Sequence, residues 1–301
     1  MDQAQSTWWR ALRAYSFSAT IIPVLCAFLF VHATGRGVDW LFFPLMLSSA
    51  LLLHAGVNLL NDYYDFILGF DTPAASGSSG LLTQGIVAPN YMLRWGQFYV
   101  VAGAVAGLIL AASRGWALLP AGATAIAGSW FYSHRSGYKY KGIGEPLVFI
   151  LMGPLLFCSA GYAACGTVTV NMLIFSLPFG ALVTAILLAN NIRDVEMDSA
   201  AGFMTLPMRI GLPSAKRLFA GLLATAFLIP ALLTVFRPAT FPSLLFLLSL
   251  PLAGRLTRQV QQARTPQTDL QNAPQQTAAL YLLFGILLAV GLFLCKTPGS
   301  A

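Results

Sequence analysis

The chain has 301 residues, of which 57% are hydrophobic and only 9% are charged, and its mean hydropathy is +0.72. A water-soluble domain carries roughly 25% charged residues, so this chain has too little polar surface to cover a soluble particle of its size. The net charge of +7 comes from 17 basic and 10 acidic residues. In so apolar a chain, this excess indicates basic loops beside anionic headgroups and argues against nucleic-acid binding.

Apolar stretches recur along the whole chain, each near the roughly 20 residues that cross a bilayer as a helix. There are nine of them, at residues 17–34, 41–60, 92–112, 116–132, 146–164, 171–191, 216–236, 241–256 and 277–295. We therefore expect an all-α polytopic membrane protein with about nine transmembrane helices. They would form a single membrane-embedded domain over residues 1–301.

The basic residues predict the orientation of these helices. With nine spans and a cytoplasmic N-terminus, four of the 17 basic residues fall outside, namely Arg36, Arg114, Arg237 and Lys296, and the other 13 fall inside. Cytoplasmic loops carry an excess of Lys and Arg, so this orientation is favoured. Short loops and a start without a transit-peptide pattern favour a bacterial plasma membrane.

An acidic cluster follows the second apolar stretch, at the inner face. Its sequence runs Asn-Leu-Leu-Asn-Asp-Tyr-Tyr-Asp from Asn58 to Asp65, with Asp71 six residues further on. On a helix, Asn58, Asp62 and Asp65 are spaced i, i+4, i+7 and share one face. Their like charges repel, and this repulsion is poorly screened beside an apolar phase.

A second acidic cluster follows the sixth stretch, also at the inner face. Asn190, Asp194 and Asp198 are spaced i, i+4, i+8, which again predicts one helical face. Mg²⁺ prefers carboxylate oxygens and commonly bridges them to substrate phosphates. Two facing clusters predict a Mg²⁺ site around one diphosphate, because ionisable groups near the bilayer are usually functional.

Basic residues on the same face can neutralise that diphosphate. Arg193 lies within the second cluster, and Lys139 and Lys141 lie in the loop at 133–145. Lys and Arg pair with phosphate oxygens through charge-assisted hydrogen bonds. We therefore expect these three residues, with Asn58 and Asn190, to bind the substrate diphosphate.

Four blocks resemble the UbiA superfamily of membrane prenyltransferases, most closely the branch that prenylates 1,4-dihydroxy-2-naphthoate in menaquinone synthesis. The blocks are Asn58–Thr72, Gly77–Pro89 with Gly-Leu-Leu-Thr-Gln-Gly, Tyr138–Glu145 with Tyr-Lys-Gly-Ile-Gly-Glu, and Asn190–Gly211. With the nine stretches, the resemblance covers nearly the whole chain. Its motif loops lie near residues 61–91, 133–145 and 191–215.

The resemblance implies nine helices around a central cavity, an allylic polyprenyl diphosphate as donor and an aromatic quinone precursor as acceptor. It implies catalytic Mg²⁺ ligands at Asp62, Asp65, Asp194 and Asp198, with Asn58, Asp71 and Asn190 as further candidates. The polyprenyl tail would lie in an apolar groove open to lipid.

Two departures from the family pattern concern basic residues. Relatives often carry one between the first motif and the Gly-Leu-Leu block, and many read Gly-Lys-Arg-Thr-Leu after the second motif. Here the first stretch has none, and residues 202–206 read Gly-Phe-Met-Thr-Leu. Some charge that neutralises the diphosphate is therefore missing or comes from elsewhere in the chain.

The expected reaction begins with loss of the diphosphate, which leaves a cation-like allylic carbon for the acceptor ring to attack. Tyrosine ring faces can stabilise such a cation. The candidates are Tyr63, Tyr64, Tyr132 and Tyr138, at least two of which we assign to the interfacial aromatic belt. Asp65 or Asp71 is the candidate proton acceptor, and His54 and His134 are interpreted as structural.

Other functions fit parts of this pattern. Within the superfamily, the acceptor can be 4-hydroxybenzoate, homogentisate, a haem vinyl group or a glycerol lipid. A cation or metabolite transporter also uses intramembrane acids, but those lie at the midplane and not at helix ends. Alcohol phosphotransferases need Asp-Gly and Ala-Arg in one acidic motif, which neither cluster contains. Donor length and oligomeric state are not fixed by the sequence.

Overall fold

The computed structural model describes residues 8–71, 78–134, 137–202, 204–235 and 238–295. In these ranges the chain is helical, without a β-sheet, as predicted. The start of the block at Gly77, and the basic residues Arg135, Arg237 and Lys296, lie outside the described residues.

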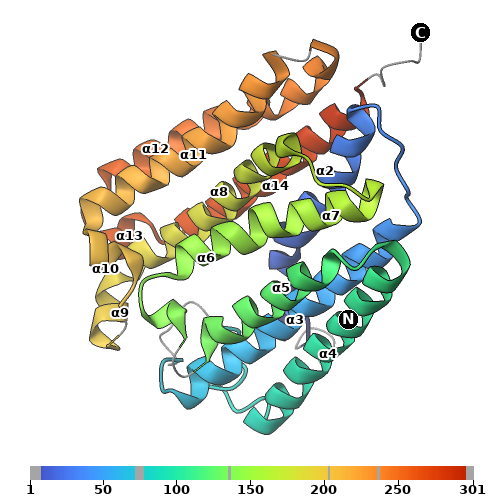
Figure 1. Ribbon diagram of the computed structural model, residues 1–301. Coiled ribbons are helices and arrows are strands. Elements are labelled where there is room, and N and C mark those ends of the chain that lie inside the picture. The colour runs from blue at the N-terminus through green and yellow to red at the C-terminus, as the bar shows by residue number, and fades with distance from the viewer. Residues whose placement is uncertain (1–7, 72–77, 135–136, 203, 236–237, 296–301) are drawn as a thin grey trace.

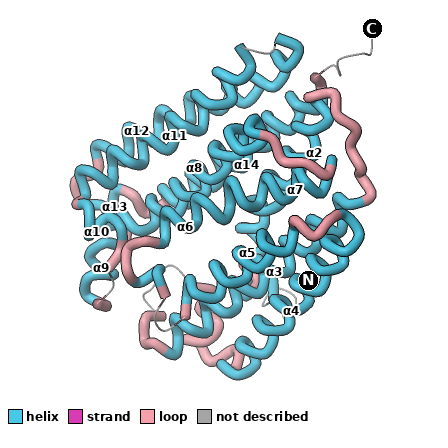
Figure 2. The backbone as a smooth tube through the Cα atoms, in the orientation of Figure 1, coloured by secondary structure: helices cyan, strands magenta, loops and turns pink. Residues whose placement is uncertain are grey.

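Long helices run side by side along a common direction (Figure 1), and short helices and loops join their ends (Figure 2). In chain order the main helices are α2 (Ser18–Ala33), α3 (Phe42–Ile67), α4 (Pro89–Arg114), α5 (Leu118–Ser133), α6 (Gly144–Ile150), α7 (Leu156–Cys165), α8 (Val170–Arg193), α11 (Leu212–Val235), α12 (Leu250–Gln262) and α14 (Ala273–Phe293). The short elements are η1 (Ala14–Phe17), η2 (Tyr138–Tyr140), η3 (Leu151–Leu155), α9 (Val195–Ala200), α10 (Leu206–Ile210), η4 (Pro238–Ser249) and α13 (Pro266–Asp269).

Seven helices of the described chain are long and apolar enough to cross a membrane. One of them, Gly144–Cys165, is α6 and α7 joined through the π-helical turn η3, where Pro154 breaks the regular hydrogen bonding. The two remaining predicted stretches form shorter elements. Residues 116–132 give α5, which has 16 residues, and residues 241–256 divide between η4 and α12. The count of nine spans stays a prediction.

Close packing of small residues sets the distance between α8 and the α6–η3 helix. A Cβ added to Gly153 would lie 2.7 Å from the Cα of Gly180, and one added to Gly180 would lie 2.6 Å from the carbonyl oxygen of Phe149. Small residues let membrane helices approach until their backbones touch. This contact holds the start of α6 beside the end of α8, where two cavity-lining side chains meet.

An aromatic core lies between α7 and α8. Phe157, Phe175 and Phe179 pack together, with the Phe157 and Phe179 rings stacked at 5.2 Å. A second group, Phe227, Phe246 and Phe284, joins α11, η4 and α14. The first group packs α7 against α8, the helix whose inner end carries the second acidic cluster.

Candidate active site

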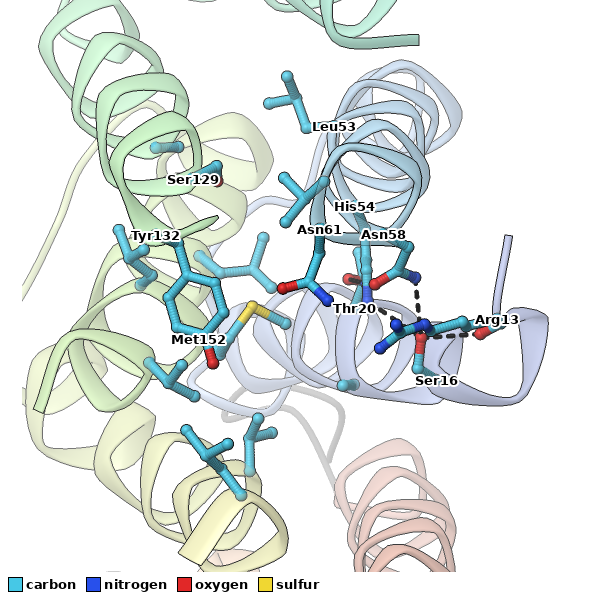
Figure 3. Close-up of a pocket in the computed structure, with 18 of the residues that line it drawn as sticks. Arg13, Ser16, Thr20, Leu53, His54, Asn58, Asn61, Ser129, Tyr132 and Met152 are labelled. Carbon is cyan, nitrogen blue, oxygen red and sulfur yellow. Dashed lines mark hydrogen bonds between the residues drawn. The ribbon is translucent and has the colours of Figure 1, made fainter. Parts of the chain in front are cut away.

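A cavity of about 1280 Å³ lies among α2, α3, α4, α5, α6, α7, α8 and α14. Its polar end is lined by side chains of both acidic clusters, and the rest of its wall is largely apolar. Figure 3 shows part of this wall, with Asn61 of α3 pointing toward Tyr132 of α5 and Asn58 pointing toward Ser16. The cavity therefore joins a charged end to an apolar length inside one helical bundle.

The first acidic cluster lies on the last turns of α3, as the spacing predicts. Asp65 accepts hydrogen bonds from Lys139 Nζ at 2.6 Å and from Asn61 Nδ2 at 3.0 Å, and it lines the cavity. Asp62 is 1% exposed and does not line the cavity. Instead it forms an ion pair with Arg13 and accepts a hydrogen bond from the Ser79 amide at 3.2 Å.

Asn58 forms hydrogen bonds that connect residues 12–16, which precede α2, to this cluster. Its Nδ2 donates to the Leu12 carbonyl at 2.8 Å and to Ser16 Oγ at 3.2 Å. His54, one turn earlier on α3, bridges Ser16 Oγ at 3.1 Å and Thr20 Oγ1 at 2.7 Å. His54 therefore has the structural setting that the sequence predicts for it, and the segment it holds carries Arg13.

The second acidic cluster does not lie on one continuous helix. α8 ends at Arg193 and α9 begins at Val195, with Asp194 at the junction, so the helix is interrupted within the cluster. Asn190, Asp194 and Asp198 nevertheless all line the cavity, because Asp198 still donates its amide to the Asp194 carbonyl at 2.8 Å.

Arg193 is held inside this second cluster and is almost fully buried. Its guanidinium donates to both carboxylate oxygens of Asp194, at 2.6 and 2.5 Å, and to Asn190 Oδ1 at 2.6 Å. Burial, followed by the charge of Asp194, raises the pKa of Asp198 to about 6. The cluster is therefore compact, with its acidic charge partly offset by one cation.

Asp71 lies just beyond α3 at the same end of the cavity. Burial raises the pKa of its carboxyl group, although a hydrogen bond with the Ser78 side chain acts in the opposite direction. Its Oδ1 atom is buried, with no hydrogen-bond partner in the described part of the chain. An acidic oxygen in this setting is suited to a cationic ligand.

The residues present fit a Mg²⁺ site by their chemistry. Amide and carboxylate oxygens enter the cavity from α3 and its following loop on one side and from α8 and α9 on the other, and Mg²⁺ prefers such ligands. In the described ranges, no three His, Cys, Asp or Glu side chains converge on one point. Instead, Arg13, Lys139 and Arg193 neutralise the carboxylates.

The two predicted lysines are placed differently. Lys139 enters the cavity and contacts Asp65 and Asn61. Lys141 lies outside it, in a separate shallow hollow with Met204 and Arg209. The 3₁₀ turn η2 precedes Lys141, and residues two apart on such a turn point in different directions. The structure therefore brings Lys139, but not Lys141, to the acidic clusters.

Of the four candidate tyrosines, only Tyr132 lines the cavity. Tyr63 and Tyr64 pack against each other, and Tyr64 also packs against His134. The Tyr138 hydroxyl donates to the Gly128 carbonyl at 2.5 Å, which ties η2 to α5. Tyr132 is therefore the tyrosine positioned to meet a substrate.

Sequence reasoning missed three residues of this site. In the sequence, Arg13 is only one of the 13 basic residues on the predicted inner face, yet it pairs with Asp62 and lines the cavity. Its backbone φ of 51° lies in the left-handed region, which is uncommon for a non-glycine residue and often marks a functional site. Glu145 and Asn191 form a hydrogen-bonded pair in the wall at 2.8 Å. Both residues lie within the motif blocks Tyr138–Glu145 and Asn190–Gly211, and this position was the sequence signal that could have identified them.

Comparison with known proteins decides the family. The sequence pattern of the UbiA prenyltransferase family matches residues 20–283. The chain belongs to this family. It is therefore a prenyltransferase and an integral membrane protein, as the sequence motifs and the apolar helices predict.

The UbiA relatives come from animals and bacteria. UbiA prenyltransferase domain-containing protein 1 of Xenopus tropicalis is 31% identical over 97% of this chain and 83% of its own length. A 1,4-dihydroxy-2-naphthoate octaprenyltransferase of Bacillus subtilis is 28% identical over 95% of this chain and 92% of its own.

A solved UbiA homologue from Archaeoglobus fulgidus, bound to GPP and Mg²⁺, has the same fold. Its TM-score to this chain is 0.67 and its identity 15%, over 94% of this chain and 100% of its own.

Proposed function

We propose that this UbiA prenyltransferase transfers a polyprenyl group from an allylic diphosphate to 1,4-dihydroxy-2-naphthoate with the help of Mg²⁺. The observation that carries the proposal is the single cavity, in which two acidic clusters and their cations lie at one end of a long apolar space. A polyprenyl diphosphate has the same division into a charged head and an apolar tail.

The apolar part of the cavity fits the donor tail. From Met46 to Asp65, both of which line the cavity, α3 spans 19 residues, or about 28 Å at 1.5 Å per residue. One prenyl unit adds four C–C bonds of about 1.5 Å, or roughly 5 Å of extended chain. The cavity therefore accommodates about five prenyl units. A longer tail extends into lipid, because Leu108 and Leu119 line the cavity and are also exposed.

The charged end promotes departure of the diphosphate. Lys139 and Arg193 line the cavity and donate to carboxylates, so they are placed to redirect hydrogen bonds to diphosphate oxygens. Arg13 adds a third cation, which compensates for the basic residues missing after each motif. Asp65, Asp194 and Asp198 would hold Mg²⁺, and Asp62 would support the site through its ion pair with Arg13. When bound, Mg²⁺ would neutralise negative charge on the leaving group.

Two observations support a naphthoate acceptor. The Bacillus subtilis relative named for that acceptor covers nearly the whole chain. The block Tyr138–Glu145, which carries the likeness to that branch, contributes Lys139 and Glu145 to the cavity. Tyr132 adds an aromatic face on the same side of the cavity, and aromatic rings pack well against one another.

The proposed location is a membrane with the charged end facing the cytoplasm. It rests on the 13 basic residues that the predicted topology places on that side. A bacterial plasma membrane stays a prediction, since the similar proteins include vertebrate as well as bacterial ones.

The test is prenyl transfer in isolated membranes with radiolabelled geranylgeranyl diphosphate, with Mg²⁺ or with EDTA. The acceptors 1,4-dihydroxy-2-naphthoate and 4-hydroxybenzoate are offered separately. We expect Mg²⁺-dependent product with the naphthoate. Product only with 4-hydroxybenzoate would keep the reaction class and overturn the acceptor. No product with either would overturn the proposed reaction with these acceptors.

Two variants test the site itself. Asp194→Asn removes a carboxylate from the second cluster, and we expect it to abolish Mg²⁺-dependent transfer. Glu196→Gln is the control, because Glu196 lies on α9 but is exposed and does not line the cavity. Near wild-type turnover of the Asp194 variant would overturn the metal assignment.

A further inference from the structure

Glu145 is a carboxylate in the cavity wall that belongs to neither acidic cluster. It lies in the first turn of α6 and is only 2% exposed, yet it is among the residues that line the cavity. Its Oε1 accepts a hydrogen bond from Asn191 Nδ2 at 2.8 Å. The Gly153–Gly180 contact fixes this position, because it holds α6 against α8.

Glu145 differs from the other acids of the cavity in its partners. Asp65 and Asp194 each pair with a cation, whereas no ion pair within the described ranges includes Glu145. A buried charged group without a cation is costly, so such groups are usually functional. Asn191 is an amide, which orients the carboxylate and leaves it able to accept a proton.

The proposed reaction requires such a proton acceptor. A ring carbon beside a phenolic hydroxyl group becomes a much better nucleophile as the hydroxyl proton leaves. The acceptor must also lie near the donor head, because the new bond forms at the carbon next to the diphosphate. Lys139 and Arg193 mark the head position, and Glu145 lines the same cavity.

We propose that Glu145 is the catalytic residue that accepts the hydroxyl proton of the aromatic substrate, an inference that rests on the proposed function. As the O–H bond breaks, its proton moves to a Glu145 Oε atom and its electron pair forms the ring ketone. The ring π pair forms the C–C bond to the allylic carbon, and the C–O pair departs with the diphosphate.

The ring then recovers its aromatic state when the hydrogen of the newly substituted carbon transfers to the ketone oxygen. Glu145 releases its proton to water or to the departing diphosphate. The net change is transfer of one prenyl group and one proton, with no oxidant or reductant.

The wall beside Glu145 also fits an aromatic acceptor. Tyr132 extends into the cavity from α5 (Figure 3), and a Cβ added to Gly144, the residue before Glu145, would lie 3.5 Å from the Tyr132 ring. In this arrangement the acceptor ring packs on Tyr132 while its hydroxyl points at Glu145. Asp65 is less suited to the same role, because Lys139 and Asn61 already donate to its Oδ2.

The experiment compares Glu145→Gln and Glu145→Asp with the wild type, using naphthol acceptors whose hydroxyl groups differ in acidity. We expect Glu145→Gln to lower kcat about 100-fold or more for the least acidic acceptor, the usual size of a general-base contribution. The loss shrinks as the acceptor becomes more acidic, because an ionised hydroxyl needs no base. Glu145→Asp restores part of the rate.

Binding of a non-reactive prenyl thiolodiphosphate with Mg²⁺ is measured in parallel, and we expect it to be unchanged. Glu196→Gln, an exposed glutamate of α9 outside the cavity, is the matched control. The proposal is overturned if Glu145→Gln retains wild-type kcat, or if its loss is equal for all acceptors. It is also overturned if neither Glu145→Gln nor Glu145→Asp binds the analogue. A wild type inactive with every acceptor would instead contradict the proposed function.

Discussion

Replacing Arg13 with glutamine removes the cation that covers Asp62. The Asp62 carboxylate is 1% exposed and the Arg13 side chain 15% exposed, so their ion pair is largely shielded from water. In Arg13→Gln, the carboxylate keeps the hydrogen bond from the Ser79 amide at 3.2 Å but loses its cation. We therefore expect the metal-free variant to be less stable than the wild type.

The size of the loss follows from the burial of both groups. Removing one partner of a buried ion pair costs about 3–5 kcal/mol. Glutamine keeps a hydrogen-bond donor, so we expect about 3 kcal/mol, the lower end of that range. Under the proposed function, Mg²⁺ bound near Asp62 would supply positive charge in place of the guanidinium. At 100 times its Kd, a ligand stabilises the folded state by about 2.7 kcal/mol, which is enough to offset most of the loss.

Thermal unfolding in detergent, followed with a thiol-reactive fluorophore, measures this effect. Cys26 and Cys295 are buried free thiols, so they react only as the helices separate. We expect Arg13→Gln to unfold several degrees below the wild type in EDTA, and the difference to narrow in Mg²⁺ alone. Arg10→Gln is the control, since exposed Arg10 donates to the Ser79 carbonyl and forms no ion pair within the described residues.

Two outcomes would refute this reasoning. Equal stability of Arg13→Gln and wild type in EDTA would mean that the ion pair contributes nothing. A difference that widens when Mg²⁺ is added would mean that Arg13 supports metal binding and does not substitute for the metal.

Three further predictions concern other parts of the chain. Gly122 of α5 lines the apolar part of the cavity, and Gly122→Phe fills part of this space. We expect the variant to accept only shorter prenyl donors than the wild type, which is measured from the product lengths across a series of donors. Gly180→Ala places a methyl group 2.6 Å from the Phe149 carbonyl, and overpacking lowers thermal stability by about 1–3 kcal/mol. Hydrogen bonds from the backbone amides of Thr265 and, to a lesser extent, Arg264 lower the pKa of Asp269. We therefore expect Asp269→Asn to be less stable than the wild type above pH 3.8, the ordinary pKa of the group. Unfolding curves across pH show this difference vanishing as the pH falls through the lowered pKa.

Each of these predictions has a contrary outcome. Gly221 on α11 provides the control for both glycine variants, because an added Cβ there meets open space and the residue does not line the cavity. Unchanged product lengths in Gly122→Phe would contradict the tail position. A Gly180 variant as stable as Gly221→Ala would contradict the close helix contact. A stability difference for Asp269→Asn that persists in strong acid would contradict a stabilising role of the ionised Asp269 carboxylate.

The sequence by itself determined the membrane class, most of the helices and both acidic clusters. Hydropathy needs only local composition, because about 20 apolar residues in a row already specify a span. The i, i+4, i+7 spacing of Asn58, Asp62 and Asp65 is likewise local, since a helix places such residues on one face. The prediction for Lys141 failed where regular geometry ends, because this residue follows the 3₁₀ turn η2 and lies outside the cavity that Lys139 enters.

Only the tertiary structure decided which charged groups meet. Arg13 and Asp62 are 49 residues apart, and Glu145 and Asn191 are 46 apart, so no local period links the members of either pair. Lys139 reaches Asp65, 74 residues away, because the turn η2 presents it to the end of α3. These pairings arise from helices packed at fixed distances, and a helix-by-helix analysis contains no such distances. The proposed proton acceptor became apparent for the same reason, since only packing of α6 on α8 places Glu145 in the cavity wall.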